Sequence, residues 1–391
     1  MHVLLTVNTT WNVWNFRQPV VRALLERGHR VTVLAPRDTS VAKIELLGCR
    51  FEHLEMNGGG LNPLELPRLA RQFKSCFEND RPDIIFSYTI KNNLIGAMVA
   101  KRLGIPFVPN VTGLGTAFLS GKWLAWLTKW LYRFVFKVLP VVFFQNSDDR
   151  ELFVEGGLIK PEQARLLPGS GVDLEWFSPM APPNKSQGTL FLMVARLLRD
   201  KGVEEYVEAA RLVRKRHPDV TFQLLGPLDA SNRGAFKRTS LDNWIAEGVI
   251  EYLGEMHDVR PHMAASSCVV LPSYREGAPR TLIEAAAMAR PVIATRVPGC
   301  TAVVDDNSTG LLCDAKSAES LADAVTRFMA LSHEARVDMG LAGREKMLRE
   351  FDQAIVVQAY LAAMDALCGS RASKQTAAGT SMGSTMKGER R

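Results

Sequence analysis

Glu276 and Glu284 are separated by seven residues in the segment EGAPRTLIE (276–284), with Pro279 between them. Proline favours the first position of a helix, so the pattern predicts Glu276 on a loop and Glu284 in the second turn of a helix. The free N–H groups and the positive dipole end of such a helix bind a diphosphate well, and carboxylates accept hydrogen bonds from hydroxyls. The segment therefore predicts a binding site for a nucleotide diphosphate and its sugars. The alternative is an ordinary helix that carries two acids. The residues of this turn are Gly277, Ala278, Pro279 and Arg280.

A second group of candidate residues lies between a buried strand and a helix in residues 190–210. Arg196 offers a planar fork for phosphate, and Lys201 offers a mobile point charge. Because they lie five residues apart on a strand-to-helix turn that ends at Gly202, both would reach one diphosphate. Two solvated loop cations are the alternative for this segment alone. Taken with residues 276–284, which also follow a strand, the pair favours phosphate binding.

The elements that must hold these residues alternate between short apolar runs and helical patterns. The runs are β-branched or aromatic and are bounded by turn residues, so they predict strands. In the first half the strands span residues 2–8, 30–36, 82–88, 105–111 and 141–147, and in the second half 189–195, 220–226, 249–254, 267–273 and 291–295. Strands that alternate with helices predict a parallel sheet covered on both faces, which gives each half an α/β fold. NTTWN follows the first strand, so that half lacks the GxGxxG dinucleotide fingerprint.

The length of 391 residues predicts two domains. The segment 169–188 is rich in Gly, Pro and Ser, which is typical of a linker. It separates an N-terminal domain (1–168) from a C-terminal domain (189–350). Residues 351–368 predict an amphipathic helix, and residues 369–391 are polar, small and basic, which predicts a disordered tail.

Composition and charge exclude several classes of protein. Six scattered cysteines form no CxxC or Cys/His cluster, so neither a zinc site nor a disulfide framework is expected, and a reducing cytosol fits. The N-terminus lacks the basic region of a signal peptide. A helix that spans a bilayer needs about 18 uncharged apolar residues in a row, and the sequence contains no such stretch. Of the net charge of +7, residues 118–140 and 369–391 each carry +4, so the body of the chain is near neutral. Diffuse binding to nucleic acid would need a basic body and is not expected.

GKWLAWLTKWLYRFVFKVL (121–139) predicts an amphipathic helix with a basic face, because Lys129, Arg133 and Lys137 recur every four residues. Its tryptophans are Trp123, Trp126 and Trp130. Tryptophan and cations on one helix are typical of the membrane interface, where each cation contributes about 1 kcal/mol at an anionic surface. The alternative is a helix packed on the sheet with its basic side in water. Both interpretations hold if one side packs inward while the other lies on lipid.

Three segments of the second half resemble the family 4 retaining glycosyltransferases. They are Arg196…Lys201-Gly202, LPSYREGAPRTLIEAAAMARPVIAT (271–295) and VPGCTAVVDDNSTGLL (297–312). Segments 15–36, 112–118, 143–158 and 167–179 are similar to a bacterial subgroup that elongates sugars on undecaprenyl diphosphate for capsules, O-antigens and protein glycans. The resemblance extends over most of residues 1–368. It implies the GT-B fold, in which two Rossmann-like domains face each other across a cleft, and a last helix that returns to the first domain.

The resemblance also implies roles for the candidate residues. Glu276 would hold hydroxyls of the donor sugar and Glu284 the ribose, while Arg196 and Lys201 would neutralise the departing diphosphate with no metal or other cofactor required. The remaining candidates are Gly226 and Leu253 beside the nucleobase, Gly113 and Gly115 where the acceptor or diphosphate approaches the backbone, and Lys91 and Asn92 in place of a histidine that many members carry. The glycines at 113 and 115 would equally suit an ordinary turn.

The expected function is the retaining transfer of a sugar from a UDP-sugar to a polyprenyl-diphosphate-linked glycan, by a cytoplasmic enzyme bound peripherally to the inner membrane. The subgroup leans towards an N-acetylhexosamine as the donor sugar. Three alternatives remain: a GT-B nucleotide-sugar epimerase, a transferase with a soluble or protein acceptor, and a binding module for lipid-linked glycans without turnover. The intact set of Arg196, Lys201, Glu276 and Glu284 argues against the binding module.

Overall fold

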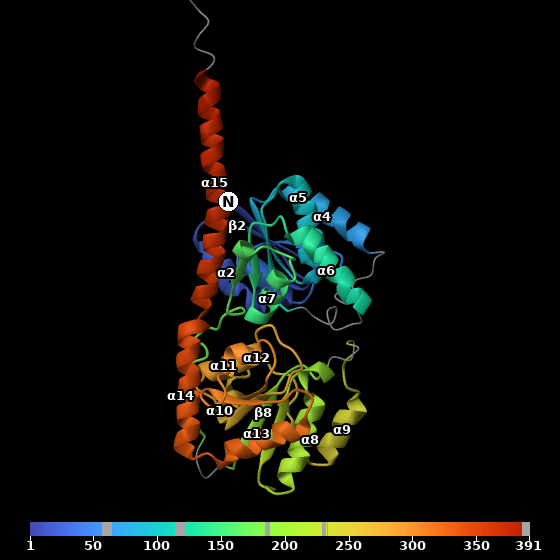
Figure 1. Cartoon of the computed structure of the whole chain (residues 1–391), viewed down its shortest axis with the longest axis vertical. Helices are drawn as coiled ribbons and strands as arrows, with labels where there is room; N and C mark the ends of the chain where they lie inside the picture. The colour runs from blue at the N-terminus through green and yellow to red at the C-terminus, as the bar shows by residue number, and fades with distance from the viewer. Residues whose placement is uncertain (57–64, 114–121, 184–187, 229–231, 233, 385–391) are drawn as a thin grey trace, which may run out of the picture. The chain divides into compact units, whose positions relative to one another are not determined.

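The computed structural model describes residues 1–56, 65–113, 122–183, 188–228, 232 and 234–384, with only the backbone for residues 122–128 and 370–384. Its contacts divide the chain into two compact units. The first unit comprises residues 1–145, 149–167 and 354–391, and the second comprises residues 146–148 and 168–353. Each unit contains a parallel sheet covered by helices (Figure 1). The segment 169–188, predicted as a linker, belongs to the second unit.

The strands of the first unit are β1 (His2–Thr6), β2 (Arg30–Ala35), β3 (Arg50–His53), β4 (Ile84–Tyr88), β5 (Phe107–Val111), β6 (Val142–Phe144) and β7 (Ala164–Leu166). Their order in the sheet is β3-β2-β1-β4-β5-β6-β7, and each neighbouring pair is parallel. All residues of β1, β4, β5 and β6 are buried. Strands buried along their whole length need cover on both faces, which explains their continuous apolar runs. The strand order reverses between β1 and β4.

Helices cover both faces of this sheet and form a separate apolar core on each. One core involves α1 (Thr10–Phe16), α2 (Gln18–Glu26), α3 (Val41–Leu46) and α15 (Gln353–Ser384). The other involves α4 (Leu66–Asp80), the π-helix η1 (Asn92–Gly96), α5 (Ala97–Leu103), α6 (Lys122–Phe136) and α7 (Ser147–Glu155). The short 3-10 helix η3 (Pro161–Gln163) precedes β7. Figure 1 shows α4, α5 and α6 gathered on one side of the sheet, with α2 and α15 on the other.

The strands of the second unit are β8 (Leu190–Val194), β9 (Thr221–Leu225), β10 (Glu251–Tyr252), β11 (Cys268–Leu271), β12 (Val292–Thr295) and β13 (Gly310–Cys313). Their order is β10-β9-β8-β11-β12-β13, again with parallel neighbours. The helices are η4 (3-10, Arg199–Lys201), α8 (Val203–Arg214), α9 (Arg238–Ala246), α10 (Arg260–Ala265), α11 (Arg280–Ala287), α12 (Cys300–Val303), α13 (Ala318–Ala330) and α14 (His333–Glu350). The α/β fold predicted for each half is therefore confirmed.

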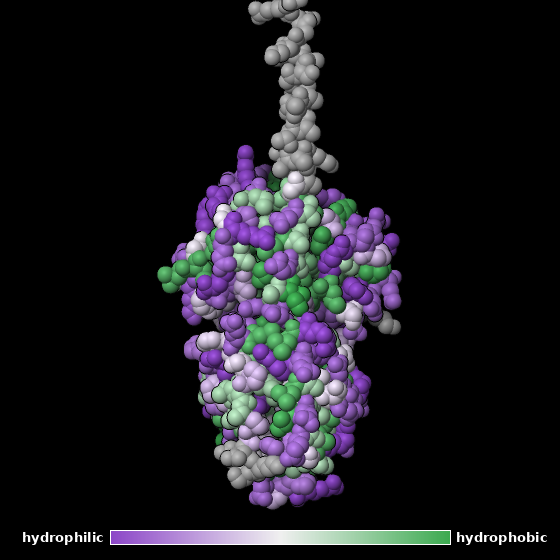
Figure 2. Space-filling model, turned by 90° about the vertical axis from the view of Figure 1, so that its left-hand side faces the viewer, coloured by the Kyte–Doolittle hydropathy of each residue, from purple (hydrophilic) through white to green (hydrophobic). Residues whose placement is uncertain are grey.

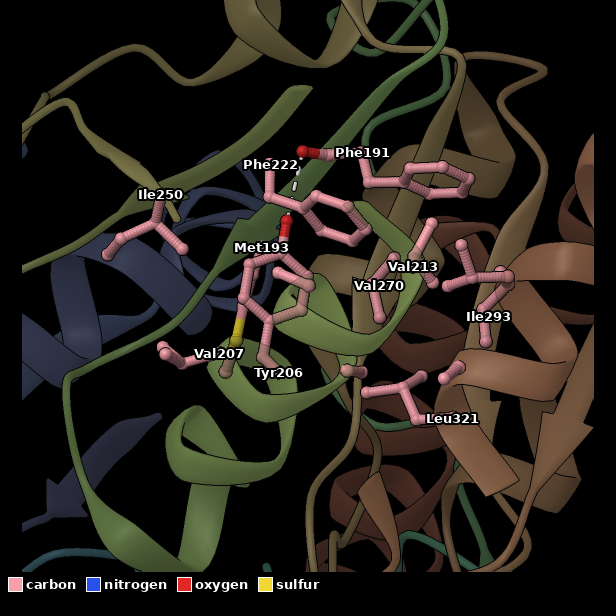
Figure 3. Close-up of a cluster of buried hydrophobic side chains, with 14 of the residues drawn as sticks. Phe191, Met193, Tyr206, Val207, Val213, Phe222, Ile250, Val270, Ile293 and Leu321 are labelled. Atoms are coloured by element: carbon pink, nitrogen blue, oxygen red, sulfur yellow. Dashed lines mark hydrogen bonds between the residues drawn. The ribbon is translucent and has the colours of Figure 1, made fainter. Parts of the chain in front are cut away.

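Tyr206 ties α8 to the sheet in the core of the second unit (Figure 3). Its ring is fully buried, and its hydroxyl oxygen lies 2.9 Å from the carbonyl oxygen of Phe191 and 3.0 Å from that of Gln223, which share its single proton. The rings of Phe191 and Phe222 stack at 5.3 Å beside it. A buried phenol needs such a partner, because an unpaired hydroxyl in an apolar core is destabilising. The bonds fix α8, and with it the turn that precedes α8.

All ten predicted strands are present, but β3, β7 and β13 were not predicted. β3 (RFEH) and β7 (ARL) lie at the two edges of their sheet and have exposed or half-buried polar residues. An edge strand needs no continuous apolar run, so hydrophobic periodicity does not reveal it. β13 (GLLC) is fully buried but has only four residues. Short apolar runs of this kind do not distinguish a strand from a helix.

The C-terminal helix α15 extends from Gln353 to Ser384. It does not end at residue 368, so the predicted disordered tail is wrong for residues 369–384. This stretch contains several alanines and no proline, so the local sequence does not stop the helix. Residues 385–391 lie outside the described part of the chain.

The first part of α15 packs on the sheet of the first unit through Tyr360, which is fully buried. Its ring lies 4.8 Å from that of Phe86 and 4.9 Å from that of Phe143. Its hydroxyl accepts a hydrogen bond of 2.8 Å from the side-chain amide of Asn110. The helix expected at residues 351–368 is therefore held by both apolar and polar contacts with β4, β5 and β6.

The outer surface carries a mixture of residue types. In each unit, the face shown in Figure 2 has small apolar patches among hydrophilic residues. None of the helices in the described residues is both long and apolar enough to span a membrane.

Replacing Tyr360 by alanine should lower the free energy of unfolding by about 3–5 kcal/mol, because it removes a fully buried ring. Tyr360→Phe should cost about 1–3 kcal/mol, because the Asn110 amide loses its acceptor. Ile355→Ala on the same helix is the control, since Ile355 is 40% exposed and its loss should change stability by only about 0.5 kcal/mol. Urea unfolding measures all three. Equal costs for Tyr360→Ala and Ile355→Ala would contradict the packing of α15 described above.

Candidate active site

The sheet of the second unit reverses its strand order between β8 and β11. In parallel α/β sheets, ligands bind beside the carboxyl ends of the strands at such a reversal. Arg196 follows the end of β8, and Glu276 follows the end of β11. The two segments singled out in the sequence therefore leave the same edge of the sheet from neighbouring strands.

Glycine allows the chain segments at this edge to pack backbone against backbone. Gly202 has φ +74°, and a Cβ there would clash with the carbonyl oxygen of Pro272. Gly226 has φ +143°, and a Cβ there would clash with the carbonyl oxygen of Ala195. Both conformations and both close approaches require glycine. The backbone of the turn that carries Lys201 therefore packs directly against the backbone of Pro272, the residue after β11.

Lys201 and Glu276 form an ion pair in which Nζ lies 2.5 Å from Oε1. The lysine side chain is 21% exposed and the glutamate side chain 12% exposed. A half-buried, charge-assisted hydrogen bond of this kind is stronger than a surface ion pair and restrains both side chains. Because both retain some exposure, a ligand at this edge of the sheet can contact them together. Local patterns predicted each residue separately, and the fold pairs them.

Residues 297–300 pack against the backbone of the loop that carries Glu276. Gly299 has φ +83°, and a Cβ there would lie 2.6 Å from the carbonyl oxygen of Glu276 and 2.7 Å from that of Gly277. The amide of Glu276 donates to the carbonyl of Pro298 at 3.3 Å. Gly299 therefore sets the backbone position of Glu276. No local chemical signal points to this role, because the segment VPGC (297–300) is typical of an ordinary turn.

Helix α11 begins at Arg280, with Pro279 as its N-cap. The prediction that Pro279 occupies the first helical position is wrong by one residue, because ψ of 101° at Pro279 is extended rather than helical. Glu284 nevertheless lies in the second turn, 12% exposed, where its Oε1 accepts a hydrogen bond of 2.5 Å from Nε of Arg280. Burial raises the pKa of Glu284, and the guanidinium of Arg280 opposes that rise. Thr281 Oγ1 donates to the carbonyl of Val194 at 2.9 Å, which fixes the start of α11 to the end of β8.

Tyr274 links the two site loops but was not among the predicted residues. Its amide donates to the carbonyl of Asp200 at 2.9 Å, and its hydroxyl donates to Oε1 of Glu205 at 2.5 Å. Burial and the neighbouring Glu205 carboxylate raise the pKa of Tyr274, so the hydroxyl keeps its proton at neutral pH. A tyrosine beside Glu276 in the sequence suggested no such bridge, because its partners lie in another segment.

The other predicted residues of this unit lie at the same edge. Arg196 is exposed, in the turn after β8. Leu253 follows β10, and its amide donates to the carbonyl of Leu224 at 2.9 Å. The hydroxyl of Tyr252 donates to the carbonyl of Gly226 at 2.9 Å, which holds the ends of β9 and β10 together. Within the described residues, no group of three or more His, Cys, Asp or Glu side chains is arranged to hold a metal ion.

The candidates in the first unit have mixed outcomes. Asn92 is fully buried; its amide nitrogen donates to Thr6 Oγ1 at 2.7 Å, and its oxygen accepts from Thr89 Oγ1 at 2.8 Å. This side chain therefore links the ends of β1 and β4, and its role beside the acceptor stays a prediction. Lys91 is 8% exposed, and its Nζ lies 3.5 Å from Oε2 of Glu65. Gly113 follows β5 with φ +127°, which requires glycine, whereas Gly115 lies outside the described residues.

Helix α6 has an apolar side and an exposed aromatic and basic side, and the exposed side is called here the α6 face. Tyr132, Val135, Phe136 and Leu139 pack into the core. The α6 face consists of Lys129, Trp130, Arg133 and Phe134 on the helix and of Lys137 and Val138 in the turn that follows it, all of them exposed. Trp130 is 53% and Phe134 60% exposed, and their rings stack at 5.9 Å. The side chains of Trp123 and Trp126, at the start of the helix, lie outside the described atoms.

Both units match models of known protein families. Residues 188–330 match a model described as glycosyl transferases group 1. Residues 13–169 match a model described as a glycosyl transferase 4-like domain. The first match contains all strands of the second unit, together with Arg196, Lys201, Glu276 and Glu284, and the second match contains the strands β2 to β7 of the first unit.

Two curated relatives and one solved structure illustrate the similarity. The chain is 26% identical to the N,N'-diacetylbacillosaminyl-diphospho-undecaprenol alpha-1,3-N-acetylgalactosaminyltransferase of Campylobacter jejuni, over 90% of this chain and 96% of that protein. It is 25% identical to the UDP-Gal:alpha-D-GlcNAc-diphosphoundecaprenol alpha-1,3-galactosyltransferase of Escherichia coli, over 64% of this chain and 67% of that protein. The crystal structure of Anabaena HepE in complex with UDP-glucose shares the fold, with a TM-score of 0.75, 17% identity and coverage of 94% and 100%.

The family matches and the shared fold agree with the geometry of the second unit. The chain belongs to the family 4 glycosyltransferases, which have the GT-B fold of two Rossmann-like domains.

Proposed function

We propose that the chain is a retaining glycosyltransferase that moves a sugar, preferably an N-acetylhexosamine, from a UDP-sugar to a glycan on polyprenyl diphosphate. The observation that carries the proposal is the Lys201–Glu276 ion pair at the strand reversal of the second unit, beside the start of α11. The two curated relatives support the acceptor class, since both are named for transfer to diphospho-undecaprenol glycans. The E. coli relative uses a UDP-sugar.

In this proposal the donor diphosphate lies between the turn after β8 and the start of α11. An ammonium group has three N–H donors, so Lys201 can bond Glu276 with one and the diphosphate with the others. Arg196, in the same turn, adds a second cation. Negative charge on the departing diphosphate grows in the transition state, and cations held in place beforehand stabilise it without reorganising. Glu276 would accept hydrogen bonds from the donor sugar, and Glu284 from the ribose.

Lys201 and Arg196 supply the positive charge that a metal ion supplies in other transferases, so we propose that no cofactor is required. Retention is part of the same proposal, because the relatives form alpha linkages and UDP-sugars are alpha-linked donors. An epimerase would use the same donor site but form no lipid product.

The α6 face supports peripheral attachment to the cytoplasmic face of the inner membrane. Stacked aromatic rings at positions 130 and 134 cost free energy in water and are stabilised at a lipid interface. Three exposed cations on the same face would be attracted to anionic headgroups. A polyprenyl-linked acceptor lies in that membrane, so attachment would bring enzyme and acceptor together.

The proposed activity predicts a lipid product one sugar heavier than the acceptor. The purified protein would be incubated with a panel of UDP-sugars, with EDTA, and with or without an undecaprenyl-diphosphate-linked sugar. Mass spectrometry identifies the product, and NMR of the anomeric proton determines its configuration. We expect an alpha-linked product in EDTA, because lysine and arginine replace the metal. Consumption of a UDP-sugar without lipid product would contradict the proposed acceptor, and a beta-linked product would contradict retention.

Lys201→Ala and Glu276→Ala should each lower kcat/KM roughly hundredfold or more, because each removes a charge held against the reacting groups. Both variants should remain folded, because both side chains retain exposure to water and the charge left behind is partly solvated. Arg199→Ala is the matched control: it lies in the same turn but pairs with Glu204 at the surface, both side chains being more than half exposed. A wild-type rate for either site variant, or an equal loss in the Arg199 variant, would remove the proposed site.

Reversing Lys129, Arg133 and Lys137 to glutamate should weaken binding to anionic vesicles roughly hundredfold or more, since each cation contributes about 1 kcal/mol. Affinity for UDP should be unchanged, because the α6 face lies in the first unit. The control reverses Arg68, Arg71 and Lys74, which are also exposed and lie on α4 of the same unit. Sedimentation with phosphatidylglycerol vesicles measures the effect. Equal release by both triple variants would show that net charge, and not the α6 face, governs binding.

A further inference from the structure

Arg17 carries a buried charge that has no polar partner. The residue is 3% exposed, and its Nε and Nη1 atoms are inaccessible and make no hydrogen bond. Within the described residues, no carboxylate or carbonyl pairs with this guanidinium, which lies over the ring of Tyr88 with Cζ 4.3 Å from the ring centroid. A ring face attracts a cation but satisfies none of its five N–H donors. Burying an unpaired charge is strongly unfavourable, so the position calls for an explanation beyond packing.

The location of Arg17 points to a ligand. Arg17 lies between α1 and α2, which follow β1, and Tyr88 is the last residue of β4. The sheet of the first unit reverses its strand order between β1 and β4. Its carboxyl edge at this reversal is the place where open α/β sheets bind their ligands, as it is for Lys201 and Glu276 in the second unit.

The charge at this place favours an anion. Arg17 is the N-cap of α2, a helix of nine residues, and the first turn of α2 contains no acidic side chain. The free N–H groups at the start of α2 therefore lie beside Arg17, which also ends α1. A guanidinium matches phosphate oxygens with two parallel hydrogen bonds, which a neutral glycan hydroxyl cannot reproduce.

We infer that Arg17 binds the diphosphate of the polyprenyl-linked acceptor, an inference that rests on the proposed function. The second unit already provides Arg196 and Lys201 for the donor diphosphate. At the strand reversal of the first unit, the buried Lys91 pairs with Glu65, whereas the buried Arg17 faces an aromatic ring. The first unit also carries the α6 face, which would lie on the lipid that contains the acceptor. Arg17 would thus hold the anionic link between lipid and glycan and leave the glycan free to react.

The test measures binding of an undecaprenyl-diphosphate-linked N-acetylglucosamine in detergent, and binding of UDP, to the full-length protein and its variants. For Arg17→Gln, the Kd for the lipid should rise roughly ten- to hundredfold, the usual loss for a charge-assisted hydrogen bond. The Kd for UDP should stay within about twofold, and the thermal midpoint should not fall, because an unpaired buried charge is removed. Arg17→Lys should recover part of the affinity, since the charge remains but the fork is lost. Undecaprenol, which lacks the diphosphate, should bind wild type and Arg17→Gln alike.

Arg22→Gln is the matched control, because Arg22 lies on α2 as well but is exposed. Unchanged lipid affinity in Arg17→Gln would overturn the inference. An equal loss of UDP affinity would assign the guanidinium to the donor, and a lower thermal midpoint with all affinities reduced would make Arg17 a structural residue; either result also overturns it. If the wild type binds no diphosphate lipid but still consumes a UDP-sugar, the proposed acceptor fails first and the inference falls with it. If the wild type transfers to the lipid and Arg17→Gln does so equally well, only the inference fails.

Discussion

Backbone packing at the carboxyl ends of β8, β9 and β11 is the constraint on which the candidate site depends. Gly202 lies against the carbonyl of Pro272, Gly226 against that of Ala195, and Gly299 against that of Glu276. At each position a methyl group would force the chains apart. The Lys201–Glu276 pair requires this approach, because its residues come from strands far apart in the sequence and a hydrogen bond of 2.5 Å tolerates little displacement. Three glycines without side-chain chemistry therefore determine where the charged groups lie.

The sheets of the two units share one topological feature, a reversal of strand order. Each unit has a parallel sheet whose order reverses beside its first strand, between β1 and β4 in one unit and between β8 and β11 in the other. The carboxyl edge at each reversal carries a cation: Arg17 in the first unit and Lys201 in the second. Their environments differ, since Lys201 has a carboxylate partner and Arg17 has only an aromatic ring. A paired cation is stable in the absence of ligand, whereas an unpaired one favours a ligand that brings negative charge.

Helix α6 and helix α15 show how one sequence pattern can have two outcomes. Both are amphipathic, and both pack an aromatic side against the sheet of the first unit. On α15 the hydroxyl of the buried Tyr360 accepts a hydrogen bond from Asn110, so this side of the helix belongs to the core of the first unit. On α6 the outward rings of Trp130 and Phe134 stack on each other and remain exposed. Local spacing shows that each helix has two sides, but the neighbours of each side determine which one becomes core.

Hydrophobic periodicity and turn chemistry are local properties of the chain, and they were enough to predict the fold class and ten of the described strands. The same local patterns made Arg196, Lys201, Glu276 and Glu284 the candidates for the site. They did not reveal the edge strands β3 and β7, the extension of α15 beyond residue 368 or the internal bonding of Asn92. Tertiary structure alone decided that Lys201 pairs with Glu276, that Tyr274 bridges two loops, that Gly299 supports Glu276 and that Arg17 is buried without a polar partner. Each of these depends on which strands lie side by side, and strand order is set by the packing of the whole sheet rather than by the residues near any one position.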